Sequence, residues 1–282
     1  MKKFKQRLPL ILSLLLILVG IGVLLYPVVA NQLASAHRYQ VVDETKDYFA
    51  KRRAEYKKKK TLMADYNKYI YAHQNSRYAP KVTIDQIFPD NEQVAMGSID
   101  VPAISIKKMP FYFGTSDQTL NKGLGVFAQG SLPVGGKNTH AVITGHSGIE
   151  NQIYFDNIGH LKLGDVFYLT TFGKKYAYQV YKKEVVLPDQ IHKTDIKSGE
   201  DSVTLLTCTP VYFNTHRMLV TGKRIPLKRA EKKVVEKRDV FTYQNIALAI
   251  TALLILLIII FLIVRRHHAK KRKQKGESHD QK

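Results

Sequence analysis

The chain contains a single cysteine, Cys208, among its 282 residues. It therefore cannot form an intramolecular disulfide, and a framework of disulfides is excluded. The thiol is either a small buried hydrophobic residue or a nucleophile that the fold presents. An unpaired thiol is open to oxidation outside the cytoplasm, so the location of Cys208 matters for this choice.

Acidic residues are scarce, because 23 Asp and Glu accompany 44 Lys and Arg and the net charge is +21. Residues 1–30 contribute +4 and residues 265–282 contribute +6, which leaves +11 for the middle of the chain. Such an excess is typical of a solvated face near anionic headgroups or an acidic wall. No nucleic-acid-binding motif is present, so nucleic acid is not an expected partner.

Charged residues are absent from two apolar segments, 8–30 and 245–264. Each segment is long enough to cross a hydrocarbon core of about 30 Å as a helix. Basic residues stay on the cytoplasmic side of a membrane. The sequence therefore predicts a cell-membrane protein with both termini inside and residues 31–244 on the extracellular face. The basic residues precede the first segment and follow the second: Lys2, Lys3, Lys5 and Arg7, then Arg265, Arg266, Lys270, Lys271, Arg272, Lys273 and Lys275.

Residues 1–30 are either a retained membrane anchor or a cleaved signal segment. Small residues at Ala34-Ser35-Ala36 offer a cleavage site. The apolar run is longer than the 7–15 residues typical of a signal peptide, which favours the anchor. The middle of the chain is exported in either case.

Proline and glycine are absent between Pro27 and Pro80, where apolar residues recur near helical spacing. This pattern predicts a helical stalk over residues 31–75, as one long helix or two, with a break at the four lysines of 57–60. The stalk is either a solvated spacer or a packed part of the domain. Residues 76–96 have little periodicity and are expected to form a loop.

Short β-branched and aromatic runs recur over residues 97–225 between glycine, proline and asparagine. Their spacing predicts a mainly β domain, either closed or sandwiched. Residues 226–244 are basic and polar and are expected to link this domain to the transmembrane helix at 245–264. Residues 265–282 form a basic cytoplasmic tail.

Three residues could together form a catalytic site. A cysteine nucleophile requires a base and a group that stabilises an oxyanion. Cys208 ends an apolar strand, and His146 ends another at a Gly-His-Ser-Gly turn. Arg217 opens the next strand, so it is predicted to face Cys208 across an antiparallel pair. A turn histidine or a rim arginine alone has an ordinary structural interpretation, but the combination favours catalysis.

Several segments carry a resemblance to a known family. The segment TLLTCTP at 204–210, followed by NTHRMLV at 214–220, resembles the active-site segment of sortases, specifically the pilus-assembling class C enzymes. GSLPVGG at 130–136 and THAVITGHSG at 139–148 resemble the histidine segment of the same class, and DVPAISI at 100–106 also matches.

The resemblance implies a sortase-like closed β-barrel of about eight strands, with N-terminal helices and two flanking transmembrane helices. It implies that Cys208 is the nucleophile, His146 the general acid and base, and Arg217 the clamp for substrate and oxyanion. The implied reaction cleaves an LPXTG-like sorting signal between Thr and Gly through a thioester and transfers the acyl group to an amine. No cofactor is implied, and no residue cluster has metal-ligand spacing.

The implied partners are pilin or surface proteins with C-terminal sorting signals. The acceptor amine is a pilin lysine in pilus polymerisation or a cell-wall precursor in the anchoring of proteins to peptidoglycan, and the sequence does not separate these two. Two other classes of protein stay open from the residues alone. One is a non-catalytic anchored β-domain scaffold, and the other is a cysteine hydrolase.

One departure from the class C pattern concerns a lid. These enzymes usually carry an Asp-Pro-aromatic tripeptide before the barrel that covers the cysteine. Residues 76–96 contain no such tripeptide, and Phe88-Pro89-Asp90 has these residue types in reverse order. Autoinhibition by this lid is therefore not predicted.

Overall fold

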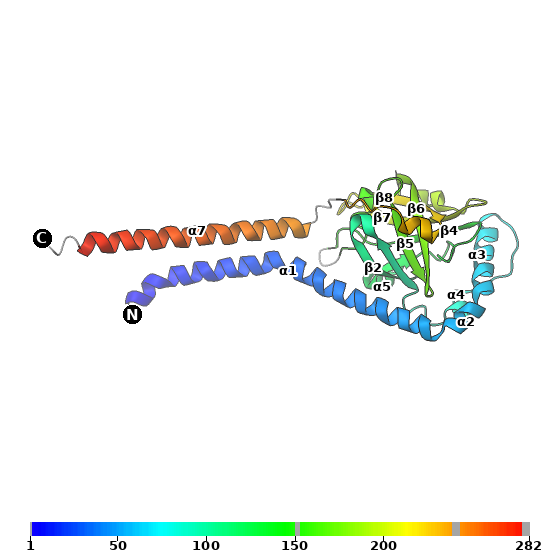
Figure 1. Ribbon diagram of the computed structural model, residues 1–282, viewed down its shortest axis with the longest axis horizontal. Helices are drawn as coiled ribbons and strands as arrows, with labels where there is room; N and C mark the ends of the chain where they lie inside the picture. The colour runs from blue at the N-terminus through cyan, green and yellow to red at the C-terminus, as the bar shows by residue number, and fades with distance from the viewer. Residues whose placement is uncertain (1, 150–152, 239–242, 278–282) are drawn as a thin grey trace. The chain divides into compact units, whose positions relative to one another are not determined.

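Apolar helices at both termini and a β-barrel with attached helices make up the chain (Figure 1). The computed structural model describes residues 2–149, 153–238 and 243–277. It divides into two units, one formed by the two terminal segments and the other by Leu33–Val240. Each unit is described by itself.

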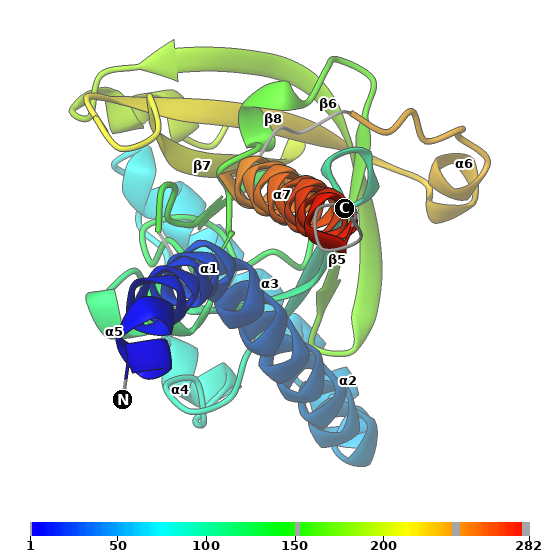
Figure 2. The ribbon, with the colours of Figure 1, turned by 90° about the vertical axis from the view of Figure 1, so that its left-hand side faces the viewer.

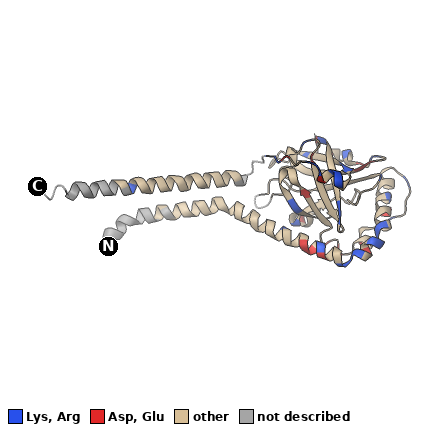
Figure 3. Cartoon of the chain, viewed as in Figure 1, with Lys and Arg blue, Asp and Glu red and all other residues tan. Residues whose placement is uncertain are grey.

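The terminal unit contains the first part of α1 (Lys2–Lys51) and α7 (Tyr243–Glu277). Both helices contain a segment long and apolar enough to cross a membrane, with mean hydropathies of 2.0 and 3.4. Within the terminal unit, Figure 3 shows almost no charged residue along the described parts of these helices. Two candidate membrane spans are therefore present, as the sequence predicts.

Eight strands form a closed barrel in the order β1-β2-β3-β4-β7-β8-β6-β5. This confirms the predicted closed barrel of about eight strands, and Figure 2 shows the long strands β6, β7 and β8 running side by side. The pairs β2–β3 and β4–β7 are parallel, and the others are antiparallel. The strands are β1 (Gly97–Val101), β2 (Ile106–Phe113), β3 (Leu124–Val126), β4 (Thr139–Thr144), β5 (Val166–Thr171), β6 (Lys174–Val186), β7 (Asp201–Thr209) and β8 (His216–Ile225).

The strands that carry the predicted site are buried on both faces. Side chains alternate between the two faces of a strand, so neighbouring residues belong to different clusters. Leu205 of β7 belongs to the main core of the barrel, and Leu206 belongs to a second apolar cluster on the outer face. This explains the nearly continuous apolar run before Cys208.

The helical region packs against the barrel and is not a solvated spacer. It continues from α1 into α2 (Arg53–Lys58) and α3 (Lys60–Gln74), with breaks at Arg52 and Lys59. On α3, the Asn67 amide exchanges two hydrogen bonds with the backbone of Leu132. The helices thereby support the connection between β3 and β4.

An aromatic cluster attaches α1, α2 and the following segment to the turn between β5 and β6. The Tyr56 ring stacks on Phe172 with centroids 5.3 Å apart, and Phe49 and Phe88 meet Phe172 edge to face. Such contacts add to the burial of large apolar surfaces. Phe88 follows a one-turn helix, α4 (Ile84–Ile87), and is completely buried.

The segment after β8 contacts the barrel before it reaches α7. It contains α6 (Leu227–Glu231), which packs against β6 and β8 through Ala230. The Arg238 side chain forms an ion pair of 2.9 Å with Asp165, and both side chains are about one-tenth exposed. The sequence predicts a linker over residues 226–244, and this ion pair joins the described part of that linker to the barrel. Two short helical elements complete this unit, α5 (Asp117–Lys122) and the 3₁₀ turn η2 (Ile158–His160).

Candidate active site

Cys208 and Arg217 are direct neighbours across β7 and β8. They are paired residues in the antiparallel register of these strands, and both side chains are partly exposed. The predicted position of Arg217 relative to Cys208 is therefore confirmed. The pairing places a thiol and a guanidinium on the same face of the sheet at the same end of the barrel.

His146 lies at the same end of the barrel, on the other side of β7. Strands β4 and β7 are parallel, with Thr144 beside Leu206. The backbone bonds continue beyond β4, because the Gly145 N–H donates to the Leu206 carbonyl at 3.1 Å. Continued by two residues from Thr144 and Leu206, this register would place His146 opposite Cys208.

Two side-chain hydrogen bonds hold the histidine segment to β7. The Thr207 hydroxyl donates to the Gly145 carbonyl at 2.7 Å. The Ser147 hydroxyl donates to the Cys208 carbonyl at 2.8 Å. These bonds flank His146 on both sides, so its backbone is fixed relative to that of Cys208. The sequence analysis did not identify either hydroxyl, because nothing local to Ser147 or Thr207 reveals a partner about sixty residues away.

His140 lies farther along the same outer face and is buried. Its Nε2 is 2.7 Å from the Thr204 hydroxyl, which is in turn 2.8 Å from the Thr221 hydroxyl. Burial lowers the pKa of His140, while a contact with the Asp195 carbonyl at 3.2 Å opposes this shift. A neutral imidazole in this network joins β4, β7 and β8.

The Arg217 guanidinium is tied to the loop between β7 and β8. Its Nη1 donates to the carbonyls of Asn214 and His216, both at 3.0 Å. Within the described residues, Nε and Nη2 have no protein acceptor, so these donors can serve a ligand. An anchored guanidinium with available donors is suited to hold a carbonyl oxygen or an oxyanion.

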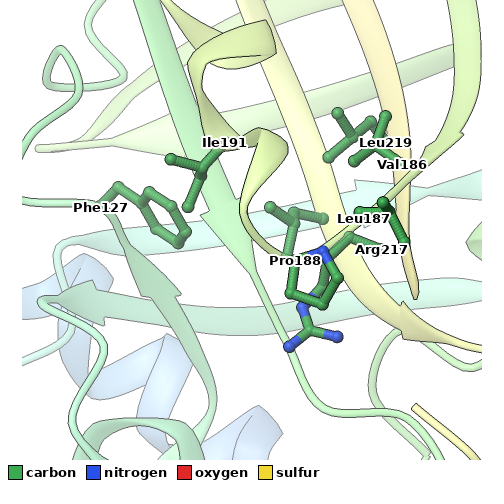
Figure 4. A pocket seen from close by; sticks show the side chains of 8 residues that line it. Phe127, Val186, Leu187, Pro188, Ile191, Arg217 and Leu219 are labelled. Carbon is green, nitrogen blue, oxygen red and sulfur yellow. The ribbon is translucent and has the colours of Figure 1, made fainter. Parts of the chain in front are cut away.

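An apolar pocket of about 60 Å³ adjoins Arg217 (Figure 4). The pocket lies between the outer apolar cluster and the connection from β6 to β7. Figure 4 shows the Phe127 ring on one side and Pro188 with the guanidinium on the other. The sequence analysis did not identify this pocket, although the apolar pair Leu187-Pro188 in an otherwise polar connection could have indicated it. Its lining residues are Phe127, Val186, Leu187, Pro188, Ile191, Leu206, Arg217 and Leu219.

The segment at the lid position does not cover Cys208. Phe88 lies in the aromatic cluster beside Phe172, and Asp90 accepts a hydrogen bond of 2.6 Å from the Tyr48 hydroxyl. Phe172 immediately precedes the turn into β6, whereas Arg217 pairs with Val186 at the other end of that strand. The aromatic residue and the aspartate of the reversed tripeptide are therefore both engaged away from the thiol.

The arrangement combines a thiol, an imidazole and a guanidinium beside an apolar pocket. Among the residues that the structure describes, no three His, Cys, Asp or Glu side chains are arranged to hold a metal ion. Such a set can form a covalent acyl intermediate, move a proton and stabilise an oxyanion.

The chain is similar to several known proteins. The model of the Sortase domain family matches residues 99–225. A solved structure of sortase C1 of GBS pilus island 1 is 36% identical, covers 67% of this chain and 98% of its own, and has a TM-score of 0.60. Clostridium perfringens sortase C, solved with the C-terminal cell wall sorting motif, is 39% identical over 66% of this chain and 100% of its own, with a TM-score of 0.58. Sortase A of Bacillus anthracis is 28% identical over 79% of this chain and 98% of its own length.

Proposed function

Because this chain belongs to the sortase family of cysteine transpeptidases, we propose that it polymerises pilin subunits with Cys208 as its nucleophile. The substrate is a protein that ends in an LPXTG-like sorting signal, and the acceptor is a lysine of another pilin subunit. The observation that carries this proposal is the pairing of Cys208 with Arg217, with the His146 segment held to the other side of β7. The similarity to sortase C structures supports the pilus role.

In the first half-reaction, the Cys208 sulfur attacks the carbonyl carbon of the threonine and forms a thioester. The bond to the glycine nitrogen breaks, and His146 donates a proton to the departing amine. An amide nitrogen leaves poorly without a proton, so this step needs a general acid near the scissile bond. The released product is the C-terminal fragment of the sorting signal.

In the second half-reaction, the acceptor amine attacks the thioester carbon. His146 takes the proton from the attacking amine, and the carbon–sulfur bond breaks to restore the cysteine. The product is an isopeptide bond between two subunits. A thioester preserves the acyl energy of the original amide, so no cofactor is needed to drive the exchange.

Arg217 stabilises the oxyanion in both half-reactions. Its hydrogen bonds to the carbonyls of Asn214 and His216 hold the guanidinium in place before the substrate binds. Preorganised donors of this kind stabilise the developing charge without reorganisation during the reaction. The apolar pocket next to Arg217 suits the apolar residues at the start of the sorting signal.

The two apolar helices anchor the enzyme in the cell membrane. The basic residues outside them, as read from the sequence, direct both termini inward when the first segment is retained. The barrel then lies on the extracellular face, where surface proteins expose their sorting signals.

The full-length protein in detergent micelles is tested with a pilin subunit that ends in an LPXTG-like signal. The proposal expects a ladder of covalent multimers with lysine isopeptide bonds in mass spectra, and no ladder with the Cys208→Ala variant. Transfer to a cell-wall precursor amine without any ladder would replace the pilus role by anchoring to peptidoglycan. Release of the threonine acid at a rate that added amine leaves unchanged would indicate a hydrolase.

A further inference from the structure

The chain that follows His146 returns to it through Asp156. The Asp156 carboxylate accepts hydrogen bonds from the Gly148 N–H at 2.8 Å and from the Tyr154 N–H at 3.1 Å, one on each oxygen. The Phe155 N–H donates to the carbonyl of His146 itself at 3.1 Å. The carboxylate and one backbone bond therefore connect residues 154–156 to the segment 146–148.

The carboxylate is held in a poorly solvated environment. The neighbouring side chains of Tyr154, Phe155 and Ile158 are buried. Burial raises the pKa of Asp156, and hydrogen bonds from backbone N–H groups partly offset this effect. A partly buried carboxylate is unfavourable unless its hydrogen bonds are made, so the two N–H groups and the carboxylate stabilise each other.

His146 consequently lies between two sets of bonds. On one side, Thr207 and Ser147 connect its neighbours to β7. On the other side, Asp156 and Phe155 connect the turn to the chain that returns before η2. The hydrogen bonds of Ser147 and Thr207 fix the distance between the His146 backbone and that of Cys208. The hydrogen bonds of Asp156 fix the direction of the backbone after His146.

We propose that Asp156 is a positioning residue that aims His146 at the leaving nitrogen of the scissile amide. The inference rests on the proposed function, in which His146 supplies that proton. Asp156 acts through the backbone, because the hydrogen bonds that its carboxylate accepts among the described residues come from main-chain N–H groups. Without the carboxylate the turn relaxes, and His146 loses its alignment with the departing amine while the thiol stays in place.

The test compares two substrates that share the acyl part of the sorting signal. In one the leaving group is the natural glycine amide, and in the other it is a p-nitrophenyl ester. The ester leaves without a proton, so loss of the general acid slows the amide much more than the ester. The measured quantity is the ratio of ester to amide acylation rates in the full-length protein.

Asp100→Ala is the matched control for Asp156→Ala. The Asp100 carboxylate also accepts a backbone N–H eight residues away, from Lys108 at 2.9 Å. It lies on β1, which is four strands from β7 in either direction around the barrel. The control removes the same kind of bond without affecting the His146 turn.

We expect Asp156→Ala to raise the ester-to-amide ratio about 100-fold, toward that of His146→Ala. Asp156→Asn keeps one acceptor oxygen and is expected to have a smaller effect in the same direction. Alkylation of Cys208 by iodoacetamide and the melting temperature of Asp156→Asn show whether the barrel and the thiol are intact. Asp100→Ala should leave the ratio unchanged.

An equal loss of both activities in the Asp156 variants would overturn the inference, because it would indicate a merely structural role. Full amide activity in Asp156→Ala would overturn it as well. If His146→Ala itself leaves the ratio unchanged, then the proposed role of His146 fails, and the inference fails with it. The His146 variant thus separates failure of the proposed function from failure of the positioning role.

Discussion

The Ser147 hydroxyl donates a hydrogen bond of 2.8 Å to the backbone carbonyl of Cys208. The residue next to the proposed general acid is thereby bound to the proposed nucleophile. The Thr207 hydroxyl forms the reciprocal bond to the Gly145 carbonyl. The two strand ends that carry the chemistry form one unit, and the following predictions depend on its geometry.

Ser147→Ala removes the tether to Cys208 without changing the acid, the thiol or the guanidinium. We expect kcat to fall about 10-fold, because a small displacement of His146 relative to Cys208 lowers the rate of the chemical step. The free energy of unfolding should fall by about 1 kcal/mol for the lost hydrogen bond. Steady-state kinetics and urea unfolding measure the two effects. Ser116→Ala is the control, since it removes the cap of α5 at a similar cost of about 1 kcal/mol and should leave kcat unchanged.

Arg217→Lys keeps the charge and loses the fork of donors. A lysine ammonium has only three N–H donors on one atom, so after binding the two loop carbonyls it presents at most one N–H to an oxyanion, without the planar fork. We expect kcat/KM for an LPXTG-like peptide to fall about 100-fold, as for other oxyanion donors. Arg224→Lys serves as a control, because Arg224 is near the other end of β8 above the Tyr176 ring. Wild-type kinetics in Arg217→Lys would contradict the role of the guanidinium.

Ile191→Asp places a charge in the wall of the apolar pocket. Ile191 is about half exposed, at 48%, so the substitution should change stability little. The KM of the peptide should rise at least about 10-fold, because the carboxylate becomes desolvated when an apolar residue binds. Leu163→Asp adds the same charge at an exposed position outside the pocket lining and should leave KM unchanged. An equal rise in both variants would argue against this pocket as the binding site.

Burial of His140 gives the stability of the barrel a specific dependence on pH. Its pKa is lowered in the folded state, so the unfolded chain binds more protons once the pH falls below its usual value near 6.5. Stability from this residue is thus present above about pH 6.5 and is lost on acidification. His140→Gln should lose less unfolding free energy than the wild type between about pH 8 and about pH 5.5. His160→Gln changes an exposed histidine and should follow the wild-type curve in the same chemical unfolding experiments.

Phe88→Ala tests the attachment of the helical region. Phe88 is completely buried among four aromatic neighbours, and its truncation should cost about 3–5 kcal/mol of unfolding free energy. Tyr78→Ala, at a position that is 93% exposed, should cost less than about 0.5 kcal/mol. A similar loss in both variants, measured by urea unfolding, would contradict the packed role of this segment.

The local parts of this structure could be predicted from the sequence. The apolar runs that end at His146 and Cys208 lie on β4 and β7, and the spacing to Arg217 matches the pairing of β7 with β8. The two apolar helices follow directly from their composition. In each case the signal lies within one or two neighbouring elements.

The remaining features depend on contacts between distant segments. The parallel pairing of β4 with β7 joins residues about sixty positions apart, and no local pattern fixes that register. Ile191 lines the pocket and Asp156 contacts the His146 segment only because the folded chain brings separate segments together, and the sequence does not show these contacts. The composition around Arg238 predicts a linker, but it does not show that Arg238 forms an ion pair with Asp165 of the barrel unit.

The most direct test is to look for an acyl group on Cys208. The full-length protein is incubated with an LPXTG-like peptide and quenched in acid, and the peptide that contains Cys208 is analysed by mass spectrometry. The account predicts a thioester-linked acyl group on that peptide, which disappears when a primary amine is added and reappears as the amide product. Peptide cleavage without an acyl group on Cys208, or cleavage that persists in Cys208→Ala, would contradict it.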